Sequence, residues 1–253
     1  MKRLENNVTI ITGGGKGIGY GLAEAFAEAG SNLVITGRTE SRLMAAKEKL
    51  EAAYGVEVLP IVADGADEEA LKSVIAQTVA RFGKINTLVN NAQVSKSGLP
   101  LVDHTKEDFD LAIYSGLYAA FFYMRECHPY LKETHGSVIN FASGAGLFGK
   151  LGQSSYAAAK EGIRGLSRVA AAEWGPDGIR VNVICPLAMT ESLQDWKEHF
   201  PELFEKTIQG IPLGHFADPK DDIGRVAVFL ASEDAHYVTG ETITLQGGSG
   251  LRP

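Results

Sequence analysis

The chain has 253 residues, of which 45% are hydrophobic and 22% charged, a composition typical of a soluble globular protein that excludes the disordered and fibrous classes. Its net charge of −7 argues against nucleic acid as a partner, because a protein that neutralises phosphates needs a basic face. Two cysteines are too few for a disulfide scaffold, and no run of about 18 apolar residues could span a membrane, so we predict a cytoplasmic protein without a membrane partner.

Short β-branched runs alternate with longer segments of helical period along the chain. We expect strands at residues 8–12, 32–36, 56–62, 87–90, 137–141, 180–184 and 242–245, and helices at about 18–30, 40–54, 67–82, 105–133, 154–174 and 219–232. Strand followed by helix, repeated, is typical of a parallel sheet with helices on both faces. Because parallel crossovers are nearly always right-handed, we predict one α/β domain over residues 1–253, a doubly wound, Rossmann-type sheet of about seven strands.

Residues 187–216 interrupt this alternation with prolines and a stretch that could form one or two short helices. The segment also carries several large apolar residues: Leu187, Trp196, Phe200, Phe204 and Phe216. A long insertion after the carboxyl end of a strand, where doubly wound folds bind ligands, is a candidate substrate loop. The same pattern fits a helical excursion that only covers the core, and the sequence leaves both interpretations open.

A glycine-rich turn, GGGKGIG, covers residues 13–19, between the first expected strand and the first expected helix. Glycines in this place let the backbone turn tightly and approach a pyrophosphate, while the helix N-terminus offers free N–H groups to the anion. Glycines also make ordinary loops, but the position between strand and helix favours a dinucleotide site.

The charges after the second strand bear on the choice of dinucleotide. An acidic residue there would bind the ribose hydroxyls of NAD, whereas a basic residue suits the 2′-phosphate of NADP. Here Gly37 is followed by Arg38, with no acid before Glu40, and Lys16 adds a second positive charge in the glycine turn. Because arginine makes charge-assisted bidentate bonds to phosphate, the sequence favours NADP(H), with NAD(H) possible.

Tyr156 and Lys160 lie four residues apart in an alanine-rich segment, so both side chains share one face of the expected helix. A cationic lysine favours the tyrosinate and so lowers the phenol pKa from about 10. Such a tyrosine is a usable general acid or base for an alcohol. The pair also occurs by chance on many helices and does not decide the function by itself.

The chain resembles the short-chain dehydrogenase/reductases in motifs that are ordered along nearly its whole length. Residues 12–19 are similar to the family's TGxxxGxG turn, residues 90–92 (NNA) to its NNAG segment, and residues 156–160 to its YxxxK motif. Ser143, thirteen residues before Tyr156, matches the family's catalytic serine, and residues 239–248 are similar to its closing strand and loop.

The resemblance implies a mechanism for these residues. Ser143 would bind the substrate oxygen, Tyr156 would exchange its proton, and Lys160 would hold the nicotinamide ribose. Together with Arg38, the implied cofactor contacts are Gly13, Lys16, Ile18, Gly19, Asp64, Asn90, Tyr156, Lys160 and Thr190. The family also implies a homotetramer in which the helices at 105–133 and 154–174 pair between subunits.

Four positions depart from the family pattern. Gln93 replaces the glycine that usually follows Asn-Asn-Ala, and Gly116 stands where the family has an asparagine that holds a water of the proton relay. Glycine would leave room for a water, which Ser115 or Tyr118 could hold. Leu187 follows Pro186 in place of glycine, and Thr190 comes one residue early.

We therefore predict an oxidoreductase that transfers a hydride between NADP(H) and a ketone, aldehyde or alcohol, acting on a small and moderately hydrophobic molecule. The alternatives are an NAD-dependent alcohol, sugar or polyol dehydrogenase, a lyase or epimerase on the same scaffold, and a non-catalytic dinucleotide-binding or regulatory protein. The six histidines show no metal-binding spacing, so no metal site is predicted.

Overall fold

A computed structural model describes residues 2–250, apart from the side chain of Ser192. Seven parallel strands form one sheet in the order β3-β2-β1-β4-β5-β6-β7. Their bounds are β1 Val8–Thr12, β2 Asn32–Gly37, β3 Val58–Val62, β4 Thr87–Asn90, β5 Ser137–Phe141, β6 Arg180–Pro186 and β7 Thr242–Leu245. The predicted doubly wound sheet of about seven strands is confirmed. Residue 1 and residues 251–253 of the predicted domain lie outside the described residues.

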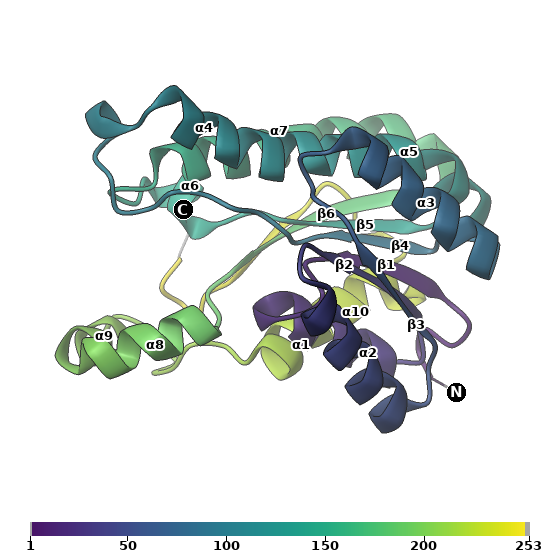
Figure 1. Ribbon diagram of the computed structural model, residues 1–253, viewed down its shortest axis with the longest axis horizontal. Helices are drawn as coiled ribbons and strands as arrows, with labels where there is room; N and C mark the ends of the chain where they lie inside the picture. Colours follow the sequence, from purple (N-terminus) through teal and green to yellow (C-terminus); the bar gives the residue numbers. More distant parts are fainter. Residues whose placement is uncertain (1, 251–253) are drawn as a thin grey trace.

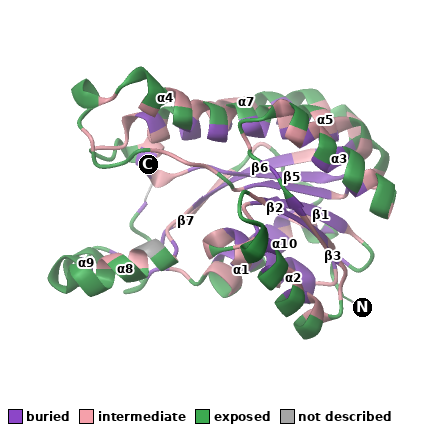
Figure 2. Cartoon of the chain, viewed as in Figure 1, coloured by how far each residue is buried: buried purple, intermediate pink, exposed green. Residues whose placement is uncertain are grey.

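Helices cover both faces of this sheet (Figure 1). On one face lie α1 (Gly17–Glu28), α2 (Glu40–Tyr54) and α10 (Arg225–Ala231), and on the other lie α3 (Glu68–Phe82), α5 (Ala119–Thr134) and α7 (Ser154–Trp174). Each face has its own apolar core, and the central strands are buried on both sides (Figure 2). Strands covered on both faces explain why the sequence shows continuous β-branched runs in place of an apolar–polar alternation.

Local sequence signals set the helix ends. The Asp67 carboxylate accepts hydrogen bonds from the backbone N–H groups of Glu69 and Ala70 at the start of α3, and Gly83 ends this helix in a left-handed conformation. Thr105 and Asp108 form a reciprocal capping box at the start of α4 (Lys106–Ala112). Each cap satisfies backbone groups that a helix terminus leaves without partners.

The helix predicted over residues 105–133 is not uniform. After α4, residues Ile113–Tyr118 form a π-helical turn before α5 begins at Ala119. The helix predicted over 219–232 also begins with a π-helical segment, Pro219–Gly224, before α10. The short helix α6 (Gly144–Phe148) was not predicted, because its glycine-rich sequence carries no helical period.

Within residues 187–216 the chain forms α8 (Glu191–His199) and α9 (Pro201–Gln209), which lie apart from the main helical layers (Figure 1). Phe204, Ile211 and Phe216 form a small core of their own, and the ring of Trp196 packs on Phe204. Most of the large apolar residues of the segment therefore stabilise the segment itself. Phe200 differs, because 56% of its surface is exposed.

Over residues 2–250, no helix is both long and apolar enough to cross a membrane.

Candidate functional site

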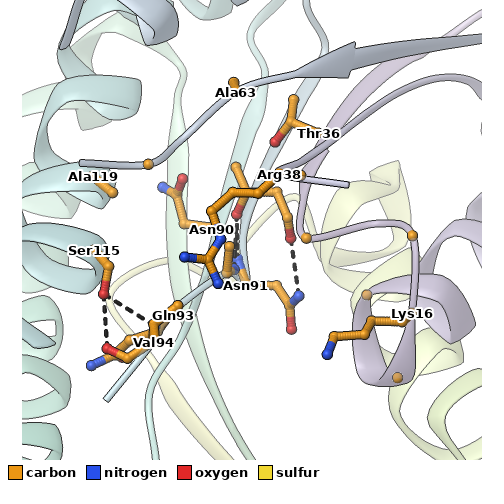
Figure 3. Close-up of a pocket in the computed structure, with 18 of the residues that line it drawn as sticks. Lys16, Thr36, Arg38, Ala63, Asn90, Asn91, Gln93, Val94, Ser115 and Ala119 are labelled. Atoms are coloured by element: carbon orange, nitrogen blue, oxygen red, sulfur yellow. Dashed lines mark hydrogen bonds between the residues drawn. The ribbon is translucent and has the colours of Figure 1, made fainter. Parts of the chain in front are cut away.

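A cleft of about 600 Å³ lies past the carboxyl ends of β1 and β4, where the strand order reverses (Figure 3). Ligands of doubly wound folds bind at this switch point, and the volume is in the range of ligand sites. The cleft brings together eight residues that the sequence predicted as cofactor contacts: Gly13, Lys16, Ile18, Gly19, Arg38, Asp64, Asn90 and Thr190.

Thr12, the last residue of β1, holds the two loops that flank the cleft. Its Oγ1 atom accepts hydrogen bonds from the backbone N–H groups of Asn91 and Ala92, each at 2.9 Å. The Asn91 side chain in turn donates to the Thr12 carbonyl at 3.0 Å. The glycine-rich turn and the loop after β4 are therefore fixed relative to each other by the backbone and one hydroxyl group.

The glycine-rich turn closes tightly on itself. A Cβ atom at Gly19 would lie 2.1 Å from the carbonyl oxygen of Gly13, so no other residue fits there. Lys16 is the N-cap of α1 but its side chain does not cap the helix, and the first turn holds no acidic residue. The first N–H groups of α1 and the positive end of its dipole are therefore available to an anion.

Two predicted basic residues stand at the rim of the cleft. Arg38 follows β2 and Lys16 follows the glycine run, and both side chains are exposed. In the described part of the chain neither forms an ion pair, so both charges are available to a ligand. Arg42, in the first turn of α2, also lines the cleft. The sequence analysis missed Arg42, although its position four residues after Arg38 was a usable signal.

Asn90 lines the cleft, and its amide has one group without a partner. Its Nδ2 atom donates to Asn140 Oδ1 at 2.8 Å, which turns the Oδ1 atom of Asn90 the other way. This Oδ1 atom is buried and has no partner in the protein. Because a buried acceptor without a partner is unfavourable, it fits a donor supplied by a bound ligand, such as a ribose hydroxyl.

Asp64 and Thr190 line the cleft but also have structural roles. The Asp64 carboxylate accepts a hydrogen bond from Ala66 N at 3.0 Å, which holds the turn after β3. Thr190 caps α8 by accepting from Leu193 N at 3.3 Å. Its methyl group lies 4.0 Å from where a Cβ atom at Gly17 would stand, so α8 begins beside the glycine-rich turn.

Ser143, Tyr156 and Lys160 come together past the carboxyl end of β5, the strand beside β4. Ser143 is the N-cap of α6, accepts a hydrogen bond from Ala145 N at 3.1 Å, and lies close enough to Tyr156 for its hydroxyl to lower the Tyr156 pKa. Lys160, one turn along α7, places its Nζ atom 5.6 Å from the centre of the Tyr156 ring. The three residues do not line the cleft over β1 and β4; they lie next to it, where a group bound in the cleft could extend.

Burial sets the protonation of this group. Lys160 is 3% exposed, and loss of hydration lowers its pKa to about 8, while its Nζ atom donates to the Phe141 carbonyl at 2.6 Å. Burial also raises the pKa of Tyr156, and the hydrogen bond from Ser143 opposes that rise. The sequence predicted a Tyr156 pKa below the ordinary value, whereas in the protein without a ligand burial raises it.

The space expected at Gly116 is filled. A Cβ atom at Gly116 would lie 2.7 Å from Cδ of Gln93, so the Gln93 side chain stands where a side chain at 116 would be. The prediction that glycine leaves room for a water is therefore wrong. Ser115 does not hold such a water either, because its hydroxyl bonds to the backbone of Val94 and Leu111.

No group of three or more histidine, cysteine or acidic side chains that could hold a metal ion occurs among the residues that the structure describes.

Comparisons with known proteins agree with this geometry. A family model described as "Enoyl-(Acyl carrier protein) reductase" matches residues 13–249. A 12alpha-hydroxysteroid dehydrogenase from Clostridium sp. is 60% identical over 259 residues, covering 100% of both chains. A 3-oxoacyl-(acyl-carrier-protein) reductase from Thermotoga maritima is 34% identical and covers 97% of this chain and 98% of its own. The crystal structure of levodione reductase superposes with a TM-score of 0.92 at 34% identity, covering 98% of this chain and 99% of that one.

The chain belongs to the short-chain dehydrogenase/reductase family. It is an oxidoreductase that acts on CH–OH or C=O groups with a nicotinamide dinucleotide as cofactor, as the sequence predicted.

The buried charge of Lys160 predicts a pH-dependent stability. Near pH 7 the lysine is protonated in both states, and the folded protein bears the full cost of burying the charge. Above pH 8 the folded state releases the proton, whereas the unfolded state keeps it up to the ordinary lysine pKa of 10.5, so the free energy of unfolding rises. We expect the difference in unfolding free energy between Lys160→Met and wild type to fall by about 3 kcal/mol from pH 7 to pH 10.5.

Urea unfolding at a series of pH values measures this difference. Lys206→Met, at an exposed position of α9, is the control and should differ from wild type by a constant amount. A Lys160→Met difference that is also constant with pH would show that the Lys160 pKa is not lowered.

Proposed function

We propose that the protein is an NADP(H)-dependent hydroxysteroid dehydrogenase, with residues 1–253 acting as one catalytic domain. The observation that carries the substrate class is the 60% identity, over the full length of both chains, to a 12alpha-hydroxysteroid dehydrogenase. The preference for NADP(H) rests on Arg38 and Lys16, which line the cleft and form no ion pair with any described acidic residue.

The residues of the cleft fit a dinucleotide. Gly13, Ile18 and Gly19, with the start of α1, would bind the pyrophosphate, and Asn90 Oδ1 would accept from a ribose hydroxyl. Arg38 and Lys16 would bind the 2′-phosphate. Asp64 would contact the adenine, and Thr190 at the start of α8 would contact the nicotinamide amide.

Ser143, Tyr156 and Lys160 would carry the proton chemistry, and the bound cofactor supplies or accepts the hydride at the carbon. In the direction of reduction, Ser143 Oγ would donate a hydrogen bond to the substrate oxygen, and the Tyr156 hydroxyl would transfer its proton to that oxygen. Lys160 is protonated at neutral pH and lies over the Tyr156 ring, so its charge would stabilise the tyrosinate that remains. Oxidation follows the same path in reverse.

Exposed apolar side chains on segments that flank this group in the sequence support an apolar substrate. Phe148 and Leu151 lie between Ser143 and Tyr156 and are 52% and 94% exposed. Leu101 and Val102 are also exposed, and the neighbouring His104 reaches Ser154 at the start of α7. A steroid presents a rigid apolar surface of the kind that such side chains cover.

We further propose a homotetramer and a reducing, cytoplasmic compartment. Tyr114, Tyr118 and Phe121 form an exposed aromatic row along the π-helical turn and α5, and a contiguous apolar row on a surface commonly marks an interface. Cys127 and Cys185 are buried and are not joined in a disulfide, which supports a compartment that does not form disulfides.

Arg38→Ala should weaken NADPH binding about 10- to 100-fold, because it removes a charge-assisted contact to the 2′-phosphate, and should leave NADH binding within about twofold. Fluorescence titration of each reduced cofactor measures both constants. Lys49→Ala on the exposed side of α2 removes the same charge away from the cleft and serves as the control. Equal weakening of NADPH and NADH binding would contradict a phosphate contact.

Tyr156→Phe should lower kcat for a 12alpha-hydroxysteroid about 100- to 10,000-fold, since it removes the exchangeable proton, while NADPH still binds. Initial rates with 3alpha-, 7alpha- and 12alpha-hydroxysteroids test the substrate and the residue together, with Tyr237→Phe, at a 94% exposed position, as the control. If wild type binds NADPH but turns over none of these hydroxysteroids, the proposed substrate class is wrong.

Tyr118→Glu combined with Phe121→Glu should shift the sedimentation coefficient from that of a tetramer to a smaller species, because two charges would be buried in the interface. Tyr237→Glu provides the exposed control. A wild-type protein that sediments as a monomer would contradict the proposed assembly.

A further inference from the structure

The end of the Gln93 side chain lies directly beside Gly116. A Cβ atom added to Gly116 would lie 2.7 Å from Cδ of Gln93 and 2.9 Å from both Nε2 and Oε1. Real Cβ atoms do not approach neighbours this closely, and Gly116 itself is buried. These atoms are the end of a flexible side chain, so a side chain at 116 would displace the Gln93 amide; the space is filled from the loop after β4 and not from the helix.

The surrounding contacts fix the position of Gln93. In the next residue, Val94 N donates to Ser115 Oγ at 3.0 Å, which holds the loop against the π-helical turn (Figure 3). Gln93 Nε2 donates to the carbonyl of Ala112, the last residue before that turn, at 3.4 Å. Since a carbonyl can only accept, this contact sets the orientation of the amide: its nitrogen faces the helix.

The amide oxygen of Gln93 then lacks a partner. Gln93 Oε1 is buried and receives no hydrogen bond from the protein. Gln93, Ser115 and Gly116 all line the cleft, together with Asn90, whose own Oδ1 is also buried without a partner. Donors from a ligand in the cleft would satisfy these two acceptors, and a buried acceptor without a partner is unfavourable.

We propose that Gln93 is a positioning residue for the reaction. Its carboxamide occupies the volume beside Gly116, and its Oε1 atom accepts a hydrogen bond from an O–H donor in the cleft. The donor is a ribose hydroxyl of the dinucleotide or a water molecule held next to it. The inference rests on the proposed function only in using NADPH as the ligand and a hydroxysteroid as the substrate.

Gln93→Met tests the acceptor, because methionine has nearly the same length but cannot accept a comparable bond. The melting temperature should change little. If the donor is a ribose hydroxyl, NADPH binding weakens about 5- to 10-fold in fluorescence titration. If the donor is a water, the NADPH binding constant stays unchanged, whereas kcat falls and the pH profile of kcat shifts. Gln77→Met, on the exposed side of α3, is the control. Wild-type values of both the binding constant and the pH profile in Gln93→Met would overturn the proposal.

A swap tests the coupling. Gly116→Asn alone should displace the Gln93 amide and weaken NADPH binding about 5- to 10-fold, as much as the loss of the acceptor in Gln93→Met. Adding Gln93→Gly removes the displaced amide altogether, so the double variant should bind NADPH about as tightly as Gly116→Asn alone. Additive effects of the two changes would overturn the coupling. Absence of steroid turnover in wild type would overturn only the proposed substrate, since the binding constants test Gln93 by themselves.

Discussion

Between β1 and β4 the strand order of the sheet reverses, so the connections from these strands leave toward opposite faces and a cleft opens at their carboxyl ends. Thr12 keeps this opening in one geometry, because its hydroxyl binds the loop after β4 while its backbone leads into the glycine-rich turn. The residues that we propose as contacts of the pyrophosphate, ribose, 2′-phosphate, adenine and nicotinamide amide all line this cleft.

The sheet also positions Ser143, Tyr156 and Lys160, the residues proposed to transfer the proton. β5 lies beside β4, and its end carries Ser143, while α7 packs over it and carries Tyr156 and Lys160. The packing of α7 on β5 and β6 buries Lys160. Burial lowers the Lys160 pKa to about 8 and reduces the free energy of unfolding at neutral pH. A lysine close to its pKa at neutral pH exchanges protons readily, so the burial that destabilises the fold also suits the residue to its proposed role.

Residues 93 and 116 of the cleft differ from the residue types usual in the family, and one packing contact relates the two differences. A π-helical turn widens the helix at Ile113–Tyr118, and the loop after β4 inserts the Gln93 amide against it. The sequence showed both departures but not their relation, because the residues are 23 positions apart and meet only when the loop after β4 packs on the helix. The pKa of Tyr156 also depends on burial, which no local pattern contains.

Much of the protein could be predicted from the sequence alone. Local composition predicted all seven strands, since each is a short β-branched run, and the glycine-rich turn, Arg38 and the Tyr156–Lys160 pair follow from residue type and spacing. Tertiary structure decided which of these residues meet: the eight cleft residues, the contact of Ser143 with Tyr156, the small core formed by Phe204 and its neighbours, and the exclusion between Gln93 and Gly116. The physical reason is that residue type and period fix local conformation, whereas desolvation and volume exclusion arise only when distant segments pack together.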